Sequence, residues 1–234
     1  MPLTQQPIGL MHSPYKQKFA IPRQPGLVKS AVGSIEFLAD YADPNALRGI
    51  EQFSHLWLIF QFHHTTDQGW TPMVRPPRLG GNKKLGVFAT RSTFRPNNMG
   101  LSVVEFDSVE HKNGKLWLHV RGMDLLDGTP ILDIKPYVPY ADCISAATGG
   151  FAQQAPSLMA VNFSPRALSQ LQRLRSRYPQ FQTLISDVLA QDPRPAYQHN
   201  SPDEKTYGMN LYEFNIQWQV VNGACEVIDI QETA

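Results

Sequence analysis

Residues 101–135 read LSVVEFDSVEHKNGKLWLHVRGMDLLDGTPILDIK, and this stretch decides the expected fold. Short apolar runs alternate with segments that contain Gly, Pro or Asp-Gly, which is the pattern of strands joined by turns. The same pattern extends back to about residue 34. We expect strands at 34–38, 55–63, 85–90, 101–106, 116–121 and 131–135. Their close spacing predicts an antiparallel barrel or sandwich.

One helix is expected to interrupt these strands near residue 43. Asp43 is a suitable N-cap, and Pro44 suits the first position of a helix because its missing N–H would have no partner there. An apolar stripe follows at Ala46, Leu47, Ile50 and Phe53. The pattern therefore predicts a short amphipathic helix.

The second half of the chain predicts a smaller unit. Residues 145–157 are uncharged and rich in Ala, Gly, Gln and Ser, as in a linker. Ser164 and Pro165 then begin a helix that ends at Tyr178, and further elements follow as a helix at 181–189 and strands at about 207–220 and 225–230. We therefore expect an α+β protein whose domains are residues 1–144 and 158–234, joined by the linker.

Composition points to a cytoplasmic protein. The chain has 234 residues, of which 42% are hydrophobic and 18% charged, and no apolar run approaches the roughly 20 residues that span a bilayer. Residues 1–10 lack the features of an export signal. Cys143 and Cys225 are far apart and unpaired in pattern, so we expect neither a disulfide nor a common zinc site. Neither membrane association nor a bound metal is expected.

The charges are unevenly distributed, although the net charge is only +1. Acidic residues are absent from 1–35, 68–104 and 143–186, and these three segments hold fourteen of the 21 basic residues. If the segments meet on one face, the protein has a surface that can bind nucleic-acid phosphates. If the basic residues are instead scattered around the fold, no such surface forms. The sequence leaves both arrangements open.

Several familiar motifs are missing. The chain has no GxGxxG after a strand and no phosphate-binding GxxxxGK[ST], so a Rossmann-type cofactor fold is not expected. It also lacks HExxH and GxSxG, which argues against metal-dependent or serine hydrolysis. The pair His63-His64 follows a predicted strand, where adjacent side chains would point to opposite faces and could not chelate one metal together.

The segment from 75 to 102, RPPRLGGNKKLGVFATRSTFRPNNMGLS, is the densest candidate for chemistry. Prolines stiffen it and Gly80-Gly81 permits left-handed backbone. Arg91 and Arg95 bracket Ser92, Thr93 and Phe94, a combination that suits phosphate, carboxylate and stacked bases. An ordinary solvated loop has a similar composition and remains the alternative.

Four motifs in this order resemble the YaeB/TrmO family of tRNA methyltransferases. They are PYKQKFAIPRQPGLV (14–28), FATRSTFRPNNMGLS (88–102), DLLDGTPILDIKPYVPYAD (124–142) and DPRPAY (192–197). The resemblance implies a single-sheeted β-barrel that binds S-adenosylmethionine without a Rossmann fold, a homodimer, and a small C-terminal domain. It also implies N6-methylation of the threonylcarbamoyl-adenosine beside the anticodon of threonine tRNA.

The resemblance also implies five places that contact the cofactor. Its motifs fall on Gln24, Pro25 and Gly26; on His63 and His64; on Arg91; on Leu101; and on Asp124, Leu125, Leu126 and Asp127. The match is imperfect, because Asn98-Met99 stands where relatives commonly have Pro-Ile and His64 stands where a Gln can occur. The second departure argues against an essential imidazole.

Methyl transfer from a sulfonium needs alignment of donor and acceptor more than a covalent nucleophile. Asp124 or Asp127 could hold the ribose hydroxyls or the amino group of the cofactor, although Asp127-Gly128 is also a common turn pair. The sequence identifies no general base. For the threonyl carboxylate and the anticodon stem-loop, the candidate contacts are Arg75, Arg78, Arg95, Arg194 and Tyr197. The segment with the last two also suits a domain-docking clamp.

Two other functions fit the same residues. The first is a methyltransferase of this fold that acts on an acceptor other than tRNA. The second is a non-catalytic RNA-binding or regulatory module, in which the Arg/Pro/Gly segment only binds RNA. Measurable binding of S-adenosylmethionine would distinguish either methyltransferase from the non-catalytic RNA-binding module.

Overall fold

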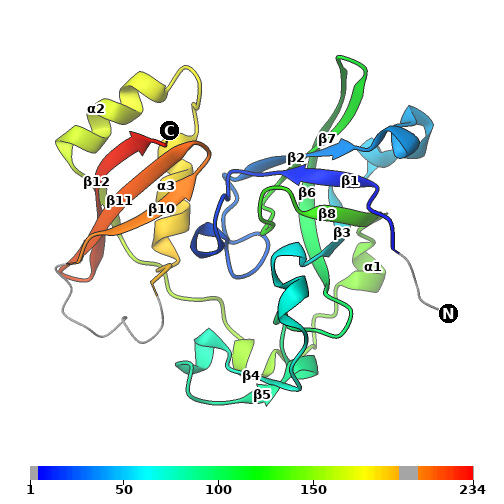
Figure 1. The fold of residues 1–234 in the computed structure, drawn as a ribbon, viewed down its shortest axis with the longest axis horizontal. Helices are drawn as coiled ribbons and strands as arrows, with labels where there is room; N and C mark the ends of the chain where they lie inside the picture. The colour runs from blue at the N-terminus through cyan, green and yellow to red at the C-terminus, as the bar shows by residue number, and fades with distance from the viewer. Residues whose placement is uncertain (1–4, 195–204, 234) are drawn as a thin grey trace.

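The computed structural model describes residues 5–194 and 205–233. Figure 1 shows a larger antiparallel sheet at the N-terminal side and a smaller unit with two helices at the C-terminal side. The protein is thus a mixed α+β protein with a large antiparallel sheet, as expected from the sequence. In that sheet each strand pairs with two neighbours, in the order β1 (Gly9–His12), β2 (Val32–Phe37), β7 (Lys115–Arg121), β6 (Met99–Lys112), β3 (His55–Gln61) and β8 (Pro130–Pro136), and β8 pairs back with β1.

Every second side chain along these strands points to the buried side of the sheet and packs in the core. Leu56, Leu58 and Phe60 of β3 are buried while the residues between them are more exposed. In β6 the buried positions are Gly100, Ser102 and Val104. Because β3 and β6 pair with Phe60 opposite Gly100, the Phe60 ring occupies the space where a side chain at position 100 would lie. The sequence missed β1, which is too short to show a period.

Two predictions in this half were wrong. The expected helix after Asp43 is two 3-10 turns, η3 (Pro44–Leu47) and η4 (Ile50–Gln52), because Gly49 between them is left-handed at φ 91°. Asp43 is still the cap and accepts a hydrogen bond from the Asn45 amide at 2.9 Å. The expected strand at 85–90 is only β5 (Leu85–Gly86), which pairs with β4 (Met73–Val74) outside the main sheet.

Short helical turns make up most connections in the first half. They are η1 (Lys18–Ala20), η2 (Ala39–Tyr41), η5 (His63–Gln68), η6 (Pro77–Leu79), η7 (Val87–Ala89), α1 (Pro139–Asp142) and, in the expected linker, η8 (Gly150–Ala152).

The C-terminal unit is a four-stranded sheet with two helices. Its sheet order is β10 (Tyr207–Leu211), β11 (Phe214–Val221), β12 (Ala224–Glu232) and β9 (Val161–Phe163), and its helices are α2 (Pro165–Leu174) and α3 (Phe181–Ala190). Both helices were predicted. The single strand expected at 207–220 is instead a hairpin, because the chain turns at Tyr212 with φ 51°. The parallel strand β9 was not predicted.

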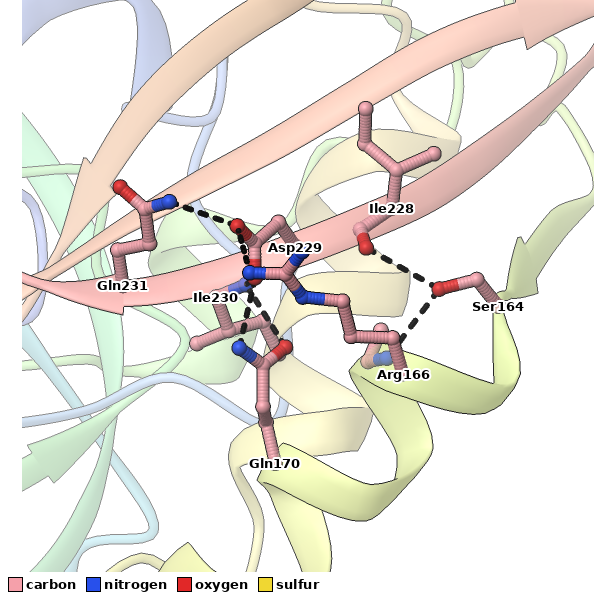
Figure 2. Close-up of polar contacts among 8 residues, drawn as sticks. Ser164, Arg166, Gln170, Ile228, Asp229, Ile230 and Gln231 are labelled. Carbon is pink, nitrogen blue, oxygen red and sulfur yellow. Dashed lines mark hydrogen bonds and ion pairs between the residues drawn. The ribbon is translucent and has the colours of Figure 1, made fainter.

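A polar cluster fixes α2 to β12, as Figure 2 shows. The buried Asp229 accepts hydrogen bonds from Arg166 at 2.9 Å, Gln170 at 2.6 Å and Gln231 at 2.7 Å. Burial raises the pKa of Asp229, but the hydrogen bonds from the two amides and the charge of Arg166 outweigh it and hold the pKa below its ordinary value of 3.8. Asp229 is therefore a satisfied structural carboxylate.

The two units share a contact at the segment between β1 and β2. The Tyr212 amide donates to the Pro14 carbonyl at 2.8 Å, and Tyr15 forms an isolated bridge with Leu211. Ser30 donates to the Asp187 carboxylate of α3 at 2.5 Å. The C-terminal unit therefore contacts the N-terminal domain through residues 13–31.

Among the described residues, no helix combines the length and the apolar character that a membrane span requires. Cys143 is exposed, Cys225 is buried, and both thiols are free.

Replacement Asp229→Asn should lower the free energy of unfolding at pH 7 by about 1–3 kcal/mol, because an amide cannot accept from all of its present donors. The native pKa is depressed, so the carboxylate stabilises the fold above pH ~4 and loses this effect as the pH falls through the native pKa. The difference between the two proteins should therefore shrink below pH 4. Urea denaturation across pH measures it.

The matched control is Asp133→Asn, which removes an ion pair with Lys135 from a side chain that is 46% exposed. Its effect should stay within about 0.5 kcal/mol. An equal loss in both variants at pH 7 would contradict the role given to Asp229.

Candidate functional site

Two segments that are far apart in sequence are bound together at one end of the large sheet. The Gly26 amide donates to the Gly122 carbonyl at 2.8 Å, and the Asp127 amide donates to the Tyr15 carbonyl at 2.9 Å. Ser13 donates twice, from its amide to the Asp127 carboxylate at 2.9 Å and from its hydroxyl to the Leu125 carbonyl at 2.8 Å. We call this contact between residues 13–31 and 122–129 the clamp. It brings Gln24–Gly26 beside Asp124–Asp127.

Two glycines in the clamp have a backbone conformation that other residues rarely adopt. Gly26 and Gly122 are left-handed, with φ 75° and 69°. A Cβ atom at position 122 would lie 3.6 Å from the Gly26 Cα atom. Gly26 is exposed, so its backbone is open to contact with a flat ligand such as a purine, whereas Gly122 is buried.

Arg91 adds a third segment to this site. Its guanidinium donates a hydrogen bond to the Gln24 side-chain oxygen. The charge of Arg91 also acts on Asp124 and opposes the rise of its pKa. Three of the five places that were predicted to contact the cofactor are thus brought together: Gln24–Gly26, Arg91 and Asp124–Asp127.

Asp124 is the titratable centre of the site. It accepts a hydrogen bond from the buried hydroxyl of Ser102 at 2.6 Å. Burial raises the pKa of Asp124 to about 6, although the Ser102 hydrogen bond and the Arg91 charge both act against the rise. Burial therefore makes the charged form of this carboxylate unfavourable. A ligand hydroxyl or ammonium group bound there would donate a hydrogen bond to the carboxylate and stabilise its charge.

Asp127 has mainly a structural part in the site. Its carboxylate accepts from the Ser13 amide and pairs with Lys16 at 2.6 Å. The turn that follows closes through the Thr129 amide, which donates to the Leu126 carbonyl at 3.2 Å, with Gly128 at φ 76°. Of the two open possibilities for Asp127, this geometry favours the turn.

The remaining predicted cofactor contacts are His63, His64 and Leu101. The histidines are in η5 and not in a strand, and their rings meet edge to face with centroids 4.4 Å apart. Burial and the charge of His64 lower the pKa of His63. Leu101 is 55% exposed and lies on the face of β6 opposite to Ser102. Within the described residues no hydrogen bond or ion pair links these three to Gln24 or Asp124.

The predicted substrate contacts have different surroundings. Arg75 is exposed, Arg78 donates to the Gln154 carbonyl in the linker, and Arg95 donates to the Thr90 and Val87 carbonyls at 2.8 and 3.3 Å. Arg194 is only 4% exposed and pairs with Asp192 at 2.8 Å. Arg194 is thus paired within its own segment, and both the docking role and contact with RNA stay predictions. Tyr197 lies outside the described residues.

Sequence reasoning missed Ser102, Ser13 and Tyr15. Ser102 had one available signal, since it is a hydroxyl residue at an inward position of an alternating strand. Tyr15 is fully buried and its hydroxyl has no hydrogen-bond partner among the described residues. Burial and the nearby charge of Asp124 hold the pKa of Tyr15 well above 10. These contacts depend on tertiary structure that local spacing does not encode.

Other features of the surface offer less chemistry. A shallow groove between η3, η4 and the β3–β8 pair is lined mainly by apolar residues, with Arg48 and Lys135 as its charged members. No group of three metal-ligating side chains occurs in residues 5–194 or 205–233. The clamp and Asp124 remain the strongest candidate for a binding site.

Comparison with known sequences agrees with the resemblance. The family model of the tRNA-methyltransferase O N-terminal domain matches residues 10–143, and that of the TrmO C-terminal domain matches residues 156–233. The chain belongs to the TrmO family. A relative from Escherichia coli strain K12, named tRNA (adenine(37)-N6)-methyltransferase, is 51% identical over 225 residues, which cover 96% of both chains.

Other TrmO relatives agree. A Pseudomonas aeruginosa protein named putative S-adenosylmethionine-dependent methyltransferase RcsF is 50% identical over 216 residues, 91% of this chain and 90% of the relative. The crystal structure of TrmO from Pseudomonas aeruginosa superposes with a TM-score of 0.82 at 40% identity and covers 99% of both chains. The fold and the family are therefore shown along nearly the whole chain.

The raised pKa of Asp124 has a consequence for stability. The native state binds the Asp124 proton more tightly than the unfolded chain, so folding stability falls as the pH rises from about 4 to above 6. Asp124→Asn retains the acceptor for Ser102 without the charge. The variant should gain about 1–3 kcal/mol in free energy of unfolding at pH 8 and almost nothing at pH 4.

Guanidinium denaturation at both pH values measures this gain. Asp133→Asn is again the control, since its side chain is 46% exposed and should show no such pH-dependent gain. A loss of stability in Asp124→Asn at pH 8 would show that the Asp124 carboxylate stabilises the native state, and would contradict the claim that its buried charge destabilises it.

Proposed function

We propose that this TrmO-family protein transfers a methyl group from S-adenosylmethionine to N6 of adenosine 37 in tRNA, the activity in the name of the Escherichia coli relative. The resemblance narrows the acceptor to threonylcarbamoyl-adenosine of threonine tRNA. The observation that carries the proposal is the clamp together with the hydrogen bond from Arg91 to Gln24. The two bring Gln24–Gly26, Arg91 and Asp124 together from three separate segments in a chain 51% identical to that enzyme.

The residues of the site fit S-adenosylmethionine. Asp124 is a partly buried carboxylate that suits ribose hydroxyls or an amino group, and Arg91 suits a carboxylate. The exposed, left-handed Gly26 leaves its backbone open to an adenine ring. When bound, the cofactor supplies an electrophilic methyl group on a sulfonium.

The chain itself contributes alignment and electrostatics. Gln24 and Arg91 hold each other, so the two segments that flank the site move together. The clamp fixes Asp124 relative to Gly26 without any mobile side chain between them. Such preorganisation matters because methyl transfer is an in-line displacement, whose rate depends on the angle and distance between donor and acceptor.

We propose a homodimer that completes the site. His63, His64 and Leu101 were expected beside the cofactor, yet Leu101 faces away from Asp124. The same outer face of β6 exposes Met99 at 36% and Leu101 at 55%, a surface that a second copy could cover. In such a dimer these residues would contact the cofactor held by the other protomer.

The remaining assignments follow from this function. We assign the cofactor and the chemistry to residues 1–144 and an accessory tRNA contact to residues 158–234, in a protein of the cytoplasm. The cyclic pairing of β1, β2, β7, β6, β3 and β8 supports the single-sheeted β-barrel that the resemblance implies.

The function is tested by nucleoside mass spectrometry of tRNA that carries threonylcarbamoyl-adenosine, after incubation with the protein and labelled S-adenosylmethionine. The expected product is the labelled N6-methyl derivative. Arg91→Gln should reduce the initial rate at subsaturating cofactor by about 10-fold or more, because the charged contact to the site and the link to Gln24 are both lost.

Arg48→Gln is the matched control, since Arg48 is an exposed arginine bonded to Asn45 away from the clamp. It should keep the wild-type rate. If the wild-type protein binds the RNA but neither binds the cofactor nor forms product, it is the RNA-binding module considered above. If product forms on another acceptor only, the enzyme reading stands and the tRNA assignment fails.

A further inference from the structure

A small hairpin next to the candidate site exposes two aromatic rings. Strands β4 and β5 pair through Met73 with Gly86, and the Val87 amide continues the pairing by donating to the Pro72 carbonyl at 2.9 Å. Trp70 and Phe88 follow directly at this same end of the ladder. Trp70 is 56% exposed and Phe88 is 74% exposed. Figure 1 shows that the hairpin projects from the large sheet on the side of the linker.

The Phe88 ring is supported from one side. The Arg95 guanidinium carbon lies 5.7 Å from the ring centroid. That guanidinium is itself fixed, because it donates to the carbonyls of Thr90 at 2.8 Å and Val87 at 3.3 Å on the same loop. Phe88 is therefore a preorganised ring that a cation backs on one side and that remains largely open to solvent.

The surrounding charge is not neutralised. Residues 68–104 contain six cations and no acid, and none of the six forms an ion pair in the part of the chain that the structure describes. Elsewhere on the large sheet lysines and arginines do have carboxylate partners, as in Lys115–Glu36, Lys135–Asp133 and Arg121–Asp107. The hairpin region therefore keeps its positive charge for an external anion.

We propose that this surface binds the unpaired nucleotides that flank the methylated adenosine. The bases stack on Phe88 and Trp70, and the phosphates contact Arg75, Lys83 and Lys84. This inference rests on the proposed function and adds to it the place where the RNA loop lies. Single-stranded nucleotides are the partner that fits, because only unstacked bases offer their faces to aromatic side chains next to a basic rim.

The position of the surface supports the same partner. Arg91 lies three residues after Phe88 and contacts Gln24 in the candidate cofactor site. A nucleotide stacked on Phe88 is thus held by the same loop that reaches the site. The next nucleotide of the RNA can then enter the cofactor site while the hairpin binds the remaining nucleotides of the RNA loop.

The test is binding of a fluorescent anticodon stem-loop RNA by anisotropy, with S-adenosylmethionine binding followed by calorimetry. Phe88→Ala and Phe88→Leu should each weaken RNA binding by about 5- to 100-fold and leave cofactor binding unchanged, whereas Phe88→Trp should retain affinity. Tyr140→Ala is the control, because Tyr140 is 92% exposed and lies on α1. It should bind like the wild type.

Salt dependence tests the basic rim. A variant with Lys83→Ala and Lys84→Ala should lower the slope of log affinity against log salt by about 1–2, and the same change at Lys112 and Lys115 should not. The proposal fails if Phe88→Leu binds RNA like the wild type, or if Phe88→Ala converts a dimer to a monomer, since the ring then belongs to an interface between copies. Absence of product from the wild-type enzyme would instead overturn the proposed function.

Discussion

The organisation of this protein depends on the hydrogen bonds that join Ser13, Tyr15 and Gly26 to residues 122–129. Four of these bonds are 2.8–2.9 Å long and join backbone to backbone or to a short side chain. They tie the long connection between β1 and β2 across one end of the large sheet. Because Pro14, Tyr15 and Ser30 of that connection also contact the C-terminal unit, a single segment links the candidate cofactor site to both parts of the protein.

Two aspartates, Asp229 and Asp124, have opposite pKa shifts because their hydrogen-bond partners differ. Asp229 is surrounded by an arginine and two amides, and these hold its pKa below the ordinary value. Asp124 has one hydroxyl partner and a more distant arginine, and burial raises its pKa to about 6. The first arrangement stabilises the native state, whereas the second leaves a carboxylate that a bound hydroxyl or ammonium group would stabilise further. The raised pKa of Asp124, which burial causes, marks this carboxylate as a candidate binding group.

Sequence patterns predicted the elements whose periodicity is long enough to detect. Strands β3, β6, β7 and β8 and helices α2 and α3 all have a clear apolar face, and Ser164 caps α2 as expected. The predictions failed where one backbone angle decides the structure, as at Gly49 and Tyr212. In the site, the motifs gave the correct segments, but the contacts of Ser102 with Asp124 and of Ser13 with Asp127 join positions 22 and 114 residues apart. Local spacing carries no information on such pairs.

Hydrogen exchange with and without saturating S-adenosylmethionine tests the central claim most directly, because the clamp bonds involve backbone amides whose exchange can be followed peptide by peptide. We expect peptides covering 22–28 and 122–128 to be protected together, while peptides covering 44–52 in the shallow groove stay unchanged. Protection confined to the groove, or to only one of the two clamp segments, would contradict the claim that the clamp builds the cofactor site.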